Sequence, residues 1–588
     1  MTVTRKALRL FLPSTRPART LIAVLLLIGA GLPAFAAGPQ QMRGVWMHAT
    51  QIKTRAEADA CVARIQRANL NAVFLLVWYW GGQAFYHSQL CPLGEDVEQG
   101  YDPLGHMIAQ CHQRGIEVHA WYVNGSYGAA QPLHVLDKHP EWAVQTDGGN
   151  ELWYDFGKPQ VRKFQSDLMI ECLRNYDLDG IHFDYIRYGP KVCWCNHCQE
   201  EFAARYGLVP VVSEKRLSFP IVAPLSGNPV AEPTTAKVLA QFSDGAAAIV
   251  TNQLGKGKVL LLNWHACRQM PPPVAETIRR ALQIWNAPRD KVFVVDTAPN
   301  RREYGRQFAR DAVAALQRLG YRAKLSDEDR LAELPKDSLL VMAAVYLIPD
   351  ETAQQLEQFV QAGGILLVID GPVRSIRKAP LQRVLGMKSS GRYFNRTELI
   401  LPAGPSDLLP SSDRKIDLEE ERSRLRKWAE YRKSGVTELV RDVYRRAKQI
   451  KPKAQVTAAV FTPLASAENV FQDWPGWLRE GIIDYVIPMA YTADNHALAT
   501  QLQEWKTIDP QLERIVPGLS IYRRTVRGPV TRDTNLILSQ RQLCIENGAH
   551  GNLFFSLHYL NDPLIDLLTS GPHRDKVPAY RPPPRKAP

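Results

Sequence analysis

The chain has little cysteine for its length, with nine cysteines in 588 residues. That density excludes a small scaffold held together by disulfide bonds, so a hydrophobic core has to stabilise the fold. No cysteine lies between Cys267 and Cys544, which excludes a thiol nucleophile from the middle of the chain. Residues 291–371 also lack a GxGxxG pattern and a phosphate-binding loop, the usual signatures of a nucleotide site.

Long hydrophobic runs are equally scarce. The run Leu21–Leu32 follows five basic residues, is too short to span a bilayer comfortably, and precedes the small-residue site Ala34-Phe35-Ala36. This pattern predicts a signal peptide over residues 1–36 and therefore a periplasmic or secreted protein. No cysteine follows the cleavage site, which argues against a lipid anchor, and we expect no transmembrane segment after signal removal.

The charge is only mildly basic. Five cations of the formal +13 belong to the leader, which leaves +8 for the exported chain. A basic surface suits an acidic cell-surface polymer, although a solvated surface is the more common explanation. Charge alone therefore does not select a partner, and we expect no nucleic acid. The Pro-rich basic end at 577–588 is typical of a disordered tail.

Strand and helix patterns alternate along the chain with short connections, which predicts a parallel sheet covered by helices. Four strands precede a change of character near residue 207 and four follow it after residue 410; they are expected at 42–50, 71–77, 116–123, 179–185, 455–461, 483–489, 515–521 and 552–557. Eight strands predict an α/β fold of the (β/α)8 TIM barrel type, interrupted after strand four by an insertion.

The insertion combines two patterns. Residues 237–263 predict antiparallel strands of a small β unit, and residues 291–371 predict a doubly wound α/β domain. The expected organisation is a signal peptide (1–36), a first barrel half (37–206), the β unit (207–287), the α/β domain (288–410), a second barrel half (411–570) and the tail (571–588).

The segment 179–185 delivers a carboxylate to the end of a buried strand. Strand alternation turns His182 and Asp184 to the barrel interior, with Asp184 at the rim where barrel active sites lie. Asp184 is therefore the first catalytic candidate, although a strand-end aspartate can also cap the next loop. Glycosidases ordinarily need a second carboxyl group, for which the chain offers Asp473 or Asp494. Asp473 can equally be a helix N-cap.

Aromatic and polar residues gather at the expected strand ends. Aromatic faces stack on pyranose rings and polar side chains bind hydroxyls, while core packing is the competing explanation. The candidate substrate-binding residues are Trp46, His48, Trp78, Trp80, Trp121, Asn124, Asp155, His182, Arg187, Gln472 and Tyr491.

The sequence Cys193-Trp-Cys195-Asn-His197-Cys198 places three thiols and one imidazole within six residues. It predicts either part of a structural zinc site or a local disulfide with a spare thiol. A zinc site needs four ligands, and the sequence contains no second cysteine pair at the usual spacing. In either case we expect the cluster to hold a loop. No organic cofactor is expected.

Five ordered motifs resemble the glycosyl hydrolase-like family 10. They are Arg43–Trp46, Gly115–Trp121, Asp179–Arg187, Gln472–Gly481 and Ile483–Tyr491. The resemblance implies a (β/α)8 barrel, export, and cleavage of glycosidic bonds, with a bacterial member acting on peptidoglycan strands stripped of peptides. It also implies site roles for Asp184 and Arg187, with Gln472, Asp473 and Tyr491 near them.

The chain departs from the family pattern after the second strand. It has Leu76-Val-Trp78 and Gly82-Gln-Ala84 where the family often has Gln-Val-Arg and Gly-Asp-Ala, which puts the same substrate subsite in doubt. The α/β part of the insertion resembles a glutamine amidotransferase-like domain, which implies either association into a homo-oligomer or a shaped active-site wall.

We therefore expect an exported glycoside hydrolase that acts on peptidoglycan glycan or another extracellular polysaccharide. Asp184 would be the nucleophile or base, and Asp473 or Asp494 the general acid. The alternative is a noncatalytic carbohydrate-binding barrel protein that lacks a competent acid.

Overall fold

The computed structural model describes residues 40–584, apart from the short segments 80–81, 128–133, 147–148, 190–192, 194, 209–220, 225–227, 243–244, 265, 267–269, 371–375, 395–396, 411–417 and 526–527. The expected signal peptide (1–36) and Trp80 lie outside these residues. Among the residues described, no helix combines the length and the apolar character needed to cross a membrane.

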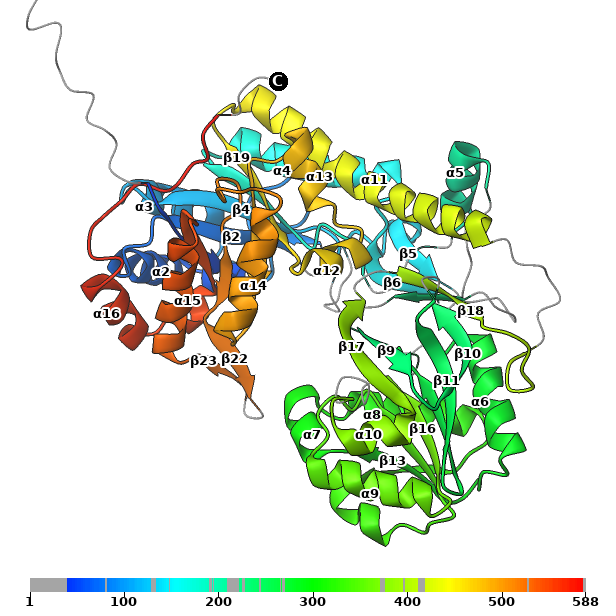
Figure 1. Ribbon diagram of the computed structural model, residues 1–588. Helices are drawn as coiled ribbons and strands as arrows, with labels where there is room; N and C mark the ends of the chain where they lie inside the picture. The colour runs from blue at the N-terminus through cyan, green and yellow to red at the C-terminus, as the bar shows by residue number, and fades with distance from the viewer. Residues whose placement is uncertain are drawn as a thin grey trace, which may run out of the picture.

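Eight parallel strands form a closed barrel, as the sequence predicted (Figure 1). β1 pairs in parallel with both β2 and β24, and this double pairing closes the sheet. The strands are β1 (Met42–Met47), β2 (Ala72–Tyr79), β4 (Glu117–Val123), β7 (Gly180–Asp184), β19 (Gln455–Val460), β20 (Tyr485–Ala490), β21 (Gly518–Ser520) and β24 (Gly551–Phe555). A two-residue strand, β3 (Gln83–Ala84), pairs antiparallel with the end of β2.

Helices cover the outside of the barrel. They include α2 (Arg55–Arg67), α3 (Pro103–His112), α4 (Pro159–Asn175), α11 (Leu418–Ile450), α13 (Trp474–Glu480), α14 (Asn495–Lys506), α15 (Thr534–Glu546) and α16 (Asp562–Ser570). A capping box at Thr54 starts α2, as the spacing to Glu57 predicts. Outward strand residues such as Ile181 and Phe183 pack on these helices, whereas inward residues such as Trp46, Phe74 and Trp121 form a separate interior cluster.

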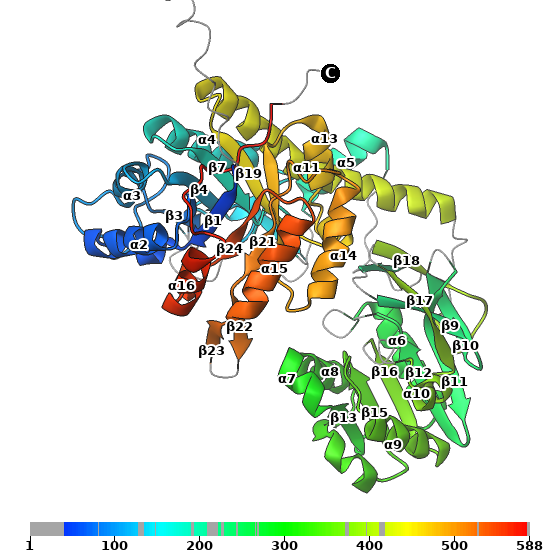
Figure 2. The ribbon, with the colours of Figure 1, turned by 60° about the vertical axis from the view of Figure 1, so that its left-hand side comes forward.

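The insertion lies between β7 and β19 and forms a second body beside the barrel (Figures 1 and 2). Its nine-stranded sheet has the order β14-β13-β15-β16-β12-β11-β10-β18-β8. The parallel strands are β14 (Ala323–Asp327), β13 (Val292–Asp296), β15 (Leu339–Ala343), β16 (Ile365–Ile369) and β12 (Gly257–Leu262). The antiparallel ones are β11 (Ala247–Leu254), β10 (Lys237–Phe242), β18 (Thr397–Pro402) and β8 (Ile221–Pro224).

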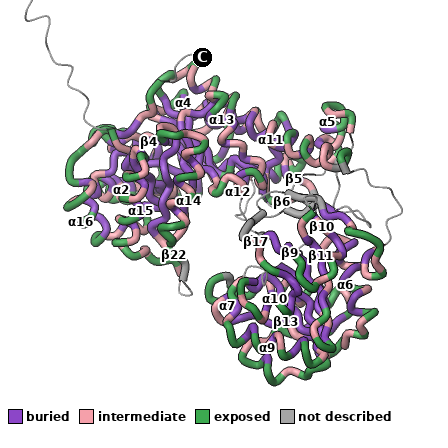
Figure 3. Tube along the Cα trace, viewed as in Figure 1, coloured by how far each residue is buried: buried purple, intermediate pink, exposed green. Residues whose placement is uncertain are grey.

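The two patterns expected in the insertion therefore belong to one sheet, because β12 pairs with both β11 and β16. The sheet has a buried cluster on each face. The covering helices include α6 (Pro272–Ile284), α8 (Gln307–Arg318), α9 (Asp350–Gln361) and α10 (Ala379–Leu385). Figure 3 shows buried residues concentrated along the strands of both bodies. The predicted likeness to a glutamine amidotransferase-like domain stays a prediction.

The C-terminal tail is ordered through Pro584, so the predicted disordered end is wrong for residues 577–584; residues 585–588 lie outside the described part. Pro578 accepts a backbone hydrogen bond from Gln41, and the Tyr580 hydroxyl donates to the Glu513 carbonyl oxygen. Arg581 donates two hydrogen bonds to Glu117, at the start of β4. The tail therefore packs across the N-terminal end of the barrel.

Candidate functional site

Strand β7 brings Asp184 to the C-terminal end of the barrel. All five residues of β7 are buried, and Asp184 pairs in register with Val123 at the end of β4. The strand begins at Gly180, where a Cβ would lie only 2.3 Å from Nδ1 of His119. A glycine is therefore required for the close packing that fixes the strand.

The carboxyl group of Asp184 is held in a dry environment. Its Oδ1 accepts a hydrogen bond of 2.7 Å from the backbone N–H of Tyr185, and its Oδ2 accepts one of 3.1 Å from Trp121 Nε1. Only 6% of the residue is exposed. Burial raises the pKa of Asp184 to about 6, against the opposing effects of the Tyr185 N–H, the Arg187 charge and the Trp121 N–H.

His182 lies one layer deeper and is fully buried. Its Nε2 accepts a 3.0 Å hydrogen bond from Trp46 Nε1, because an indole N–H can only donate. The proton of the neutral ring therefore lies on Nδ1, 2.9 Å from the Thr457 hydroxyl oxygen. Burial, and then the charge of His119, lower the pKa of His182 well below its ordinary value. His182 and Trp46 form the floor beneath Asp184.

Arg187 is surrounded by aromatic faces. Its guanidinium carbon lies 4.2 Å from the centre of the Phe461 ring, 4.4 Å from that of Tyr185 and 5.4 Å from that of Trp153. The residue is 8% exposed, and its Nε has no hydrogen-bond partner among the described residues. Burial lowers the pKa of Arg187, while the Asp184 charge opposes that shift. The ring faces thus hold the Arg187 guanidinium group in place, while its Nε–H stays available as a hydrogen-bond donor.

A second group of rings surrounds Phe555, at the end of β24. The Tyr491 ring stacks on Phe555 at 5.4 Å between centroids, and Tyr522 and His48 lie 5.9 and 6.0 Å from it. Burial and then the negative charge of Asp184 raise the pKa of Tyr491 well above its ordinary value, which places Tyr491 near that carboxylate. The predicted residues Trp46, His48, Trp121, His182, Asp184, Arg187 and Tyr491 are thus brought together. Phe461, Tyr522 and Phe555 were missed.

The two candidates for the general acid both cap helices. Asp473 accepts a 3.1 Å hydrogen bond from the backbone of Gly476 at the start of α13. Asp494 is exposed and accepts one of 2.8 Å from the backbone of His496 at the start of α14. Within the described ranges, neither carboxylate is among the groups that contact Asp184.

Three expected substrate-binding side chains point elsewhere. A register shift in the pairing of β2 with β4 turns Trp78 outward, where it packs on Tyr154 and is 2% exposed. Asn124 is buried against Gln165 of α4. Among the residues described, the Gln472 amide bonds to backbone groups of Phe461, Ile186 and Ala459. These three side chains support the rim loops.

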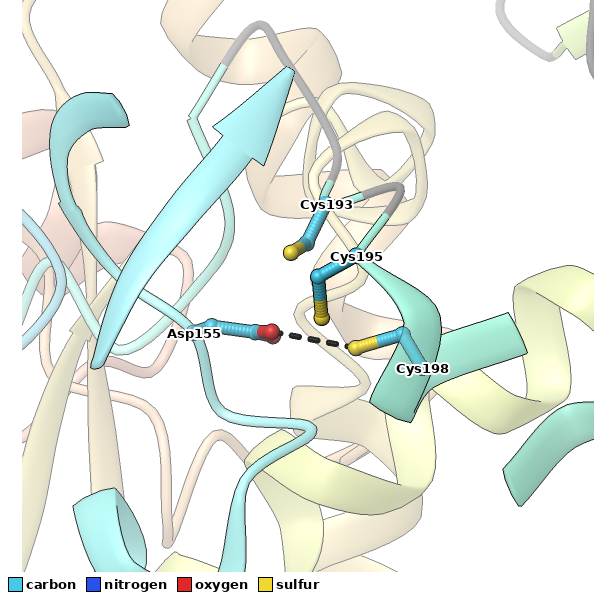
Figure 4. A group of neighbouring side chains, drawn as sticks. All are labelled: Asp155, Cys193, Cys195 and Cys198. Atoms are coloured by element: carbon cyan, nitrogen blue, oxygen red, sulfur yellow. Dashed lines mark hydrogen bonds between the residues drawn. The ribbon is translucent and has the colours of Figure 1, made fainter. Parts of the chain in front are cut away.

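Asp155 lies in a different place from the other predicted rim residues. It is fully buried and, with Cys193, Cys195 and Cys198, forms a group whose ligand atoms all lie within 4.8 Å of one another (Figure 4). The sequence identified the three thiols but not this fourth donor. Asp155 follows β6 (Gly149–Tyr154), about forty residues earlier in the chain than the cysteines, and no spacing rule connects the two segments.

Comparisons with known proteins point in one direction. The sequence model of the family described as Glycosyl hydrolase-like 10 matches residues 41–216 and 388–533, more than half of the chain. The protein named glycosyl hydrolase YngK of Bacillus subtilis is 32% identical over 141 residues, which cover 22% of this chain and 27% of that protein. The one named glycosyl hydrolase DigH of Escherichia coli K12 is 28% identical over 187 residues, 25% of this chain and 42% of that protein.

The chain thus spans less than half the length of these curated relatives. Among solved structures, the PgaB (BpsB) glycoside hydrolase domain from Bordetella bronchiseptica aligns with a TM-score of 0.40 and 10% identity, covering 90% of this chain and 98% of that one. A β-galactosidase from Bacillus circulans sp. alkalophilus aligns with a TM-score of 0.42 and 11% identity, covering 88% and 50%.

Proposed function

The chain belongs to the glycosyl hydrolase-like 10 family, and on that basis we propose that it is an exported glycoside hydrolase. Its proposed substrate is the peptidoglycan glycan of a bacterial cell wall or another extracellular polysaccharide. The single observation that carries the proposal is Asp184, a buried carboxyl group at the C-terminal end of a barrel strand, where barrel enzymes build their active sites.

The surroundings of Asp184 suit a sugar. The rings of Tyr491, Tyr522 and Phe555 offer apolar faces for stacking on pyranose rings. Arg187 offers N–H donors for hydroxyl groups or for an acidic substituent, and its ring cage fixes the direction of those donors. Apolar walls with a few fixed polar groups are the usual composition of a carbohydrate site.

In this proposal Asp184 reacts in its ionised form, as base or nucleophile. Desolvation makes its carboxylate more basic than an exposed one, and a pKa of about 6 lies near a neutral working pH. The N–H groups of Tyr185 and Trp121 fix the plane of the carboxylate. The proposed general acid is Asp473 or Asp494. In each residue, one carboxyl oxygen accepts the backbone hydrogen bond that caps a helix, so the cap uses no proton of the carboxyl group.

The same two helix caps favour a second candidate function. A carboxylate that serves as an N-cap has a structural role. In the part of the chain that is described, neither Asp473 nor Asp494 contacts Asp184. A noncatalytic carbohydrate-binding barrel would retain the aromatic wall and Arg187 but would cleave nothing.

One experiment separates the two functions. The mature protein and its Asp184→Asn variant are incubated with peptide-free peptidoglycan and with neutral and acidic glycans, and new reducing ends are counted. Release from one polymer that disappears in the variant supports the hydrolase. Binding by both proteins without any release supports the binding protein, and release that survives in the variant contradicts the role of Asp184.

A further inference from the structure

Three thiols and one carboxylate converge behind the rim, away from the proposed sugar site. Cys193, Cys195 and Cys198 follow β7, and Cys195 is the N-cap of α5 (Asn196–Tyr206). Figure 4 shows the three sulfur atoms and the Asp155 carboxylate pointing toward one another. Three of the four residues are buried, and Cys195 is half-buried.

The geometry of the group matches a tetrahedral metal site. Ligands about 2.3 Å from a zinc ion stand roughly 3.8 Å apart at the corners of a tetrahedron. The four ligand atoms all lie within 4.8 Å of one another, so small side-chain rotations suffice to reach that arrangement. The three cysteines are free thiols and form no disulfide in the structure.

Two buried cations next to the group need compensating negative charge. Arg432 of α11 is fully buried with its Nη1 3.4 Å from Asp155 Oδ1, and Lys158 lies with its Nζ 3.7 Å from Oδ2. With neutral thiols, Asp155 offers one negative charge for two cations. Three thiolates, one carboxylate, a divalent metal ion and these two cations sum to zero, which removes the cost of an uncompensated buried charge.

The hydrogen bonds around the group favour deprotonated ligands. The backbone N–H of Gln145 donates to Cys193 Sγ at 3.2 Å, and Arg432 donates to Cys198 Sγ at 3.5 Å. Tyr188 and Gly157 donate to Asp155 Oδ1, and the Cys198 thiol donates to Oδ2 at 3.0 Å, a proton that a metal ion would replace. These contacts resemble the outer partners that orient metal ligands.

We propose that Cys193, Cys195, Cys198 and Asp155 bind one Zn²⁺ ion. Soft thiolates select zinc over calcium and magnesium, and four protein ligands leave no open position, so the ion is structural. On binding, each thiol loses its proton to solvent and its sulfur donates an electron pair to the metal. The proposal is independent of the proposed hydrolase function.

The site would fix the loop that carries Arg187. The Tyr188 hydroxyl donates to Asp155, and the Tyr188 backbone N–H donates to the Val470 carbonyl oxygen. Tyr185 is therefore bonded to Asp184, and Tyr188 to Asp155 of the four-ligand group. The same group joins the β6 segment to α11 through Arg432.

The test measures metal in the full-length mature protein, prepared without a metal-affinity tag. Elemental analysis is expected to find about one zinc per chain. Replacement by Co²⁺ is expected to give the thiolate charge-transfer and d–d bands of a tetrahedral site. Metal-free protein with three reactive thiols, or a disulfide among Cys193, Cys195 and Cys198 in the mass spectrum, would overturn the proposal without any variant.

Variants then assign the ligands. Cys195→Ser and Cys198→Ser are expected to lose the zinc, whereas Cys111→Ser, which changes another buried free thiol, retains it. Asp155→Ala is expected to release zinc to a chelator at least tenfold faster than the unmodified protein, and Asp155→Cys to restore retention. Full retention of zinc in Asp155→Ala, or in both cysteine variants, overturns the assignment of the ligands.

Discussion

Both nine-stranded sheets carry a buried aspartate at a strand end, but the two aspartates have different neighbours. Asp184 ends β7 of the barrel and is 6% exposed, and Asp296 ends β13 of the insertion and is 4% exposed. Each accepts a hydrogen bond from the next backbone N–H, at 2.7 and 2.8 Å, and burial raises the pKa of each. Local strand geometry therefore makes the two carboxyl groups nearly equivalent.

The difference lies in the second set of contacts. Asp184 lies near Arg187 and Tyr491, in a wall of rings. Asp296 instead accepts a 2.9 Å hydrogen bond from the Asn300 amide of α7 (Ala298–Tyr304), which is a structural contact within the insertion. The residue after β15, Ala344, has a φ of 52° and only a methyl side chain, so that strand end offers no nucleophile. A buried strand-end carboxyl is thus not a site unless its neighbours can hold a ligand.

The largest predicted effect tests this comparison directly. Asp184→Asn keeps the shape of the side chain but removes its charge and basicity, so kcat/KM on a polymer that the reducing-end assay identifies is expected to fall at least about a thousandfold. Asp296→Asn, the matched change in the insertion, is expected to leave kcat/KM within about twofold. Equal losses in the two variants would contradict the division of roles.

The pH dependence of catalysis is the second test. In the proposed mechanism Asp184 reacts in its ionised form, so its raised pKa of about 6 predicts that kcat/KM falls roughly tenfold per pH unit below pH 6. The acid limb of the profile is the measurement. A profile that instead rises toward low pH would show that Asp184 acts as the general acid.

The arginine near Asp296, Arg301, is paired with Asp327 and Glu328, whereas Arg187 lies among ring faces, so removal of Arg187 sharpens the comparison. Arg187→Met preserves the packing between Phe461 and Tyr185 but removes all donors, and we expect kcat/KM to fall about ten- to a hundredfold. Arg187→Lys is expected to retain only part of the kcat/KM lost in Arg187→Met, because an ammonium group lacks the planar stacking of a guanidinium. Steady-state kinetics on acidic and neutral polymers show whether the donors recognise an anionic group. An unchanged kcat/KM on every polymer would remove Arg187 from the site.

The burial that raises the pKa of Asp184 also lowers the stability of the folded protein once the carboxyl group ionises. The neutral form is favoured in the folded state, so the unmodified protein loses stability as the pH rises from about 4 through 6, the interval between the unfolded and folded pKa values. Asp184→Asn does not titrate. The stability of the variant relative to the unmodified protein should therefore increase by about 2 kcal/mol between about pH 4.5 and 7.5, measured by urea unfolding. A difference that does not vary with pH would show that the carboxyl is not desolvated.

The sequence predicted the barrel, its interruption after strand four and the position of Asp184 at the end of that strand, because strand periodicity and strand order determine all three. It missed Phe461, Tyr522 and Phe555, since single aromatic residues at strand ends resemble ordinary core. It placed Trp78 on the wrong side, because a register shift depends on the pairing of β2 with β4 and leaves no local signal. Asp155 was assigned to the sugar site because its partners Arg432 and Cys198 lie far away in sequence.

The tail shows the same limit at the opposite end of the barrel. Its proline-rich basic composition predicts disorder, yet the Tyr580 ring stacks on His550 at 4.2 Å between centroids. Arg581 lies 2.7 Å from Glu117 and 3.5 Å from Asp179, so these carboxylates, unlike Asp184, face a cation directly. Composition cannot reveal the two pairs of Arg581, because they join residues more than four hundred positions apart.

Removal of that cation gives the smallest predicted effect. Arg581→Ala removes one partner of Glu117, which keeps its contact with His119 at 3.2 Å, and both side chains of the lost pair are partly exposed, so we expect a loss of only about 1 kcal/mol in the free energy of unfolding. The loss should shrink in high salt, and kcat/KM should be unchanged because the pair lies at the N-terminal end of the barrel. Arg574→Ala, elsewhere in the C-terminal segment, is the matched control for stability. A fall in activity in Arg581→Ala at full stability would mean that the two ends of the barrel are coupled, and that the chemistry of Asp184 depends on more than its immediate neighbours.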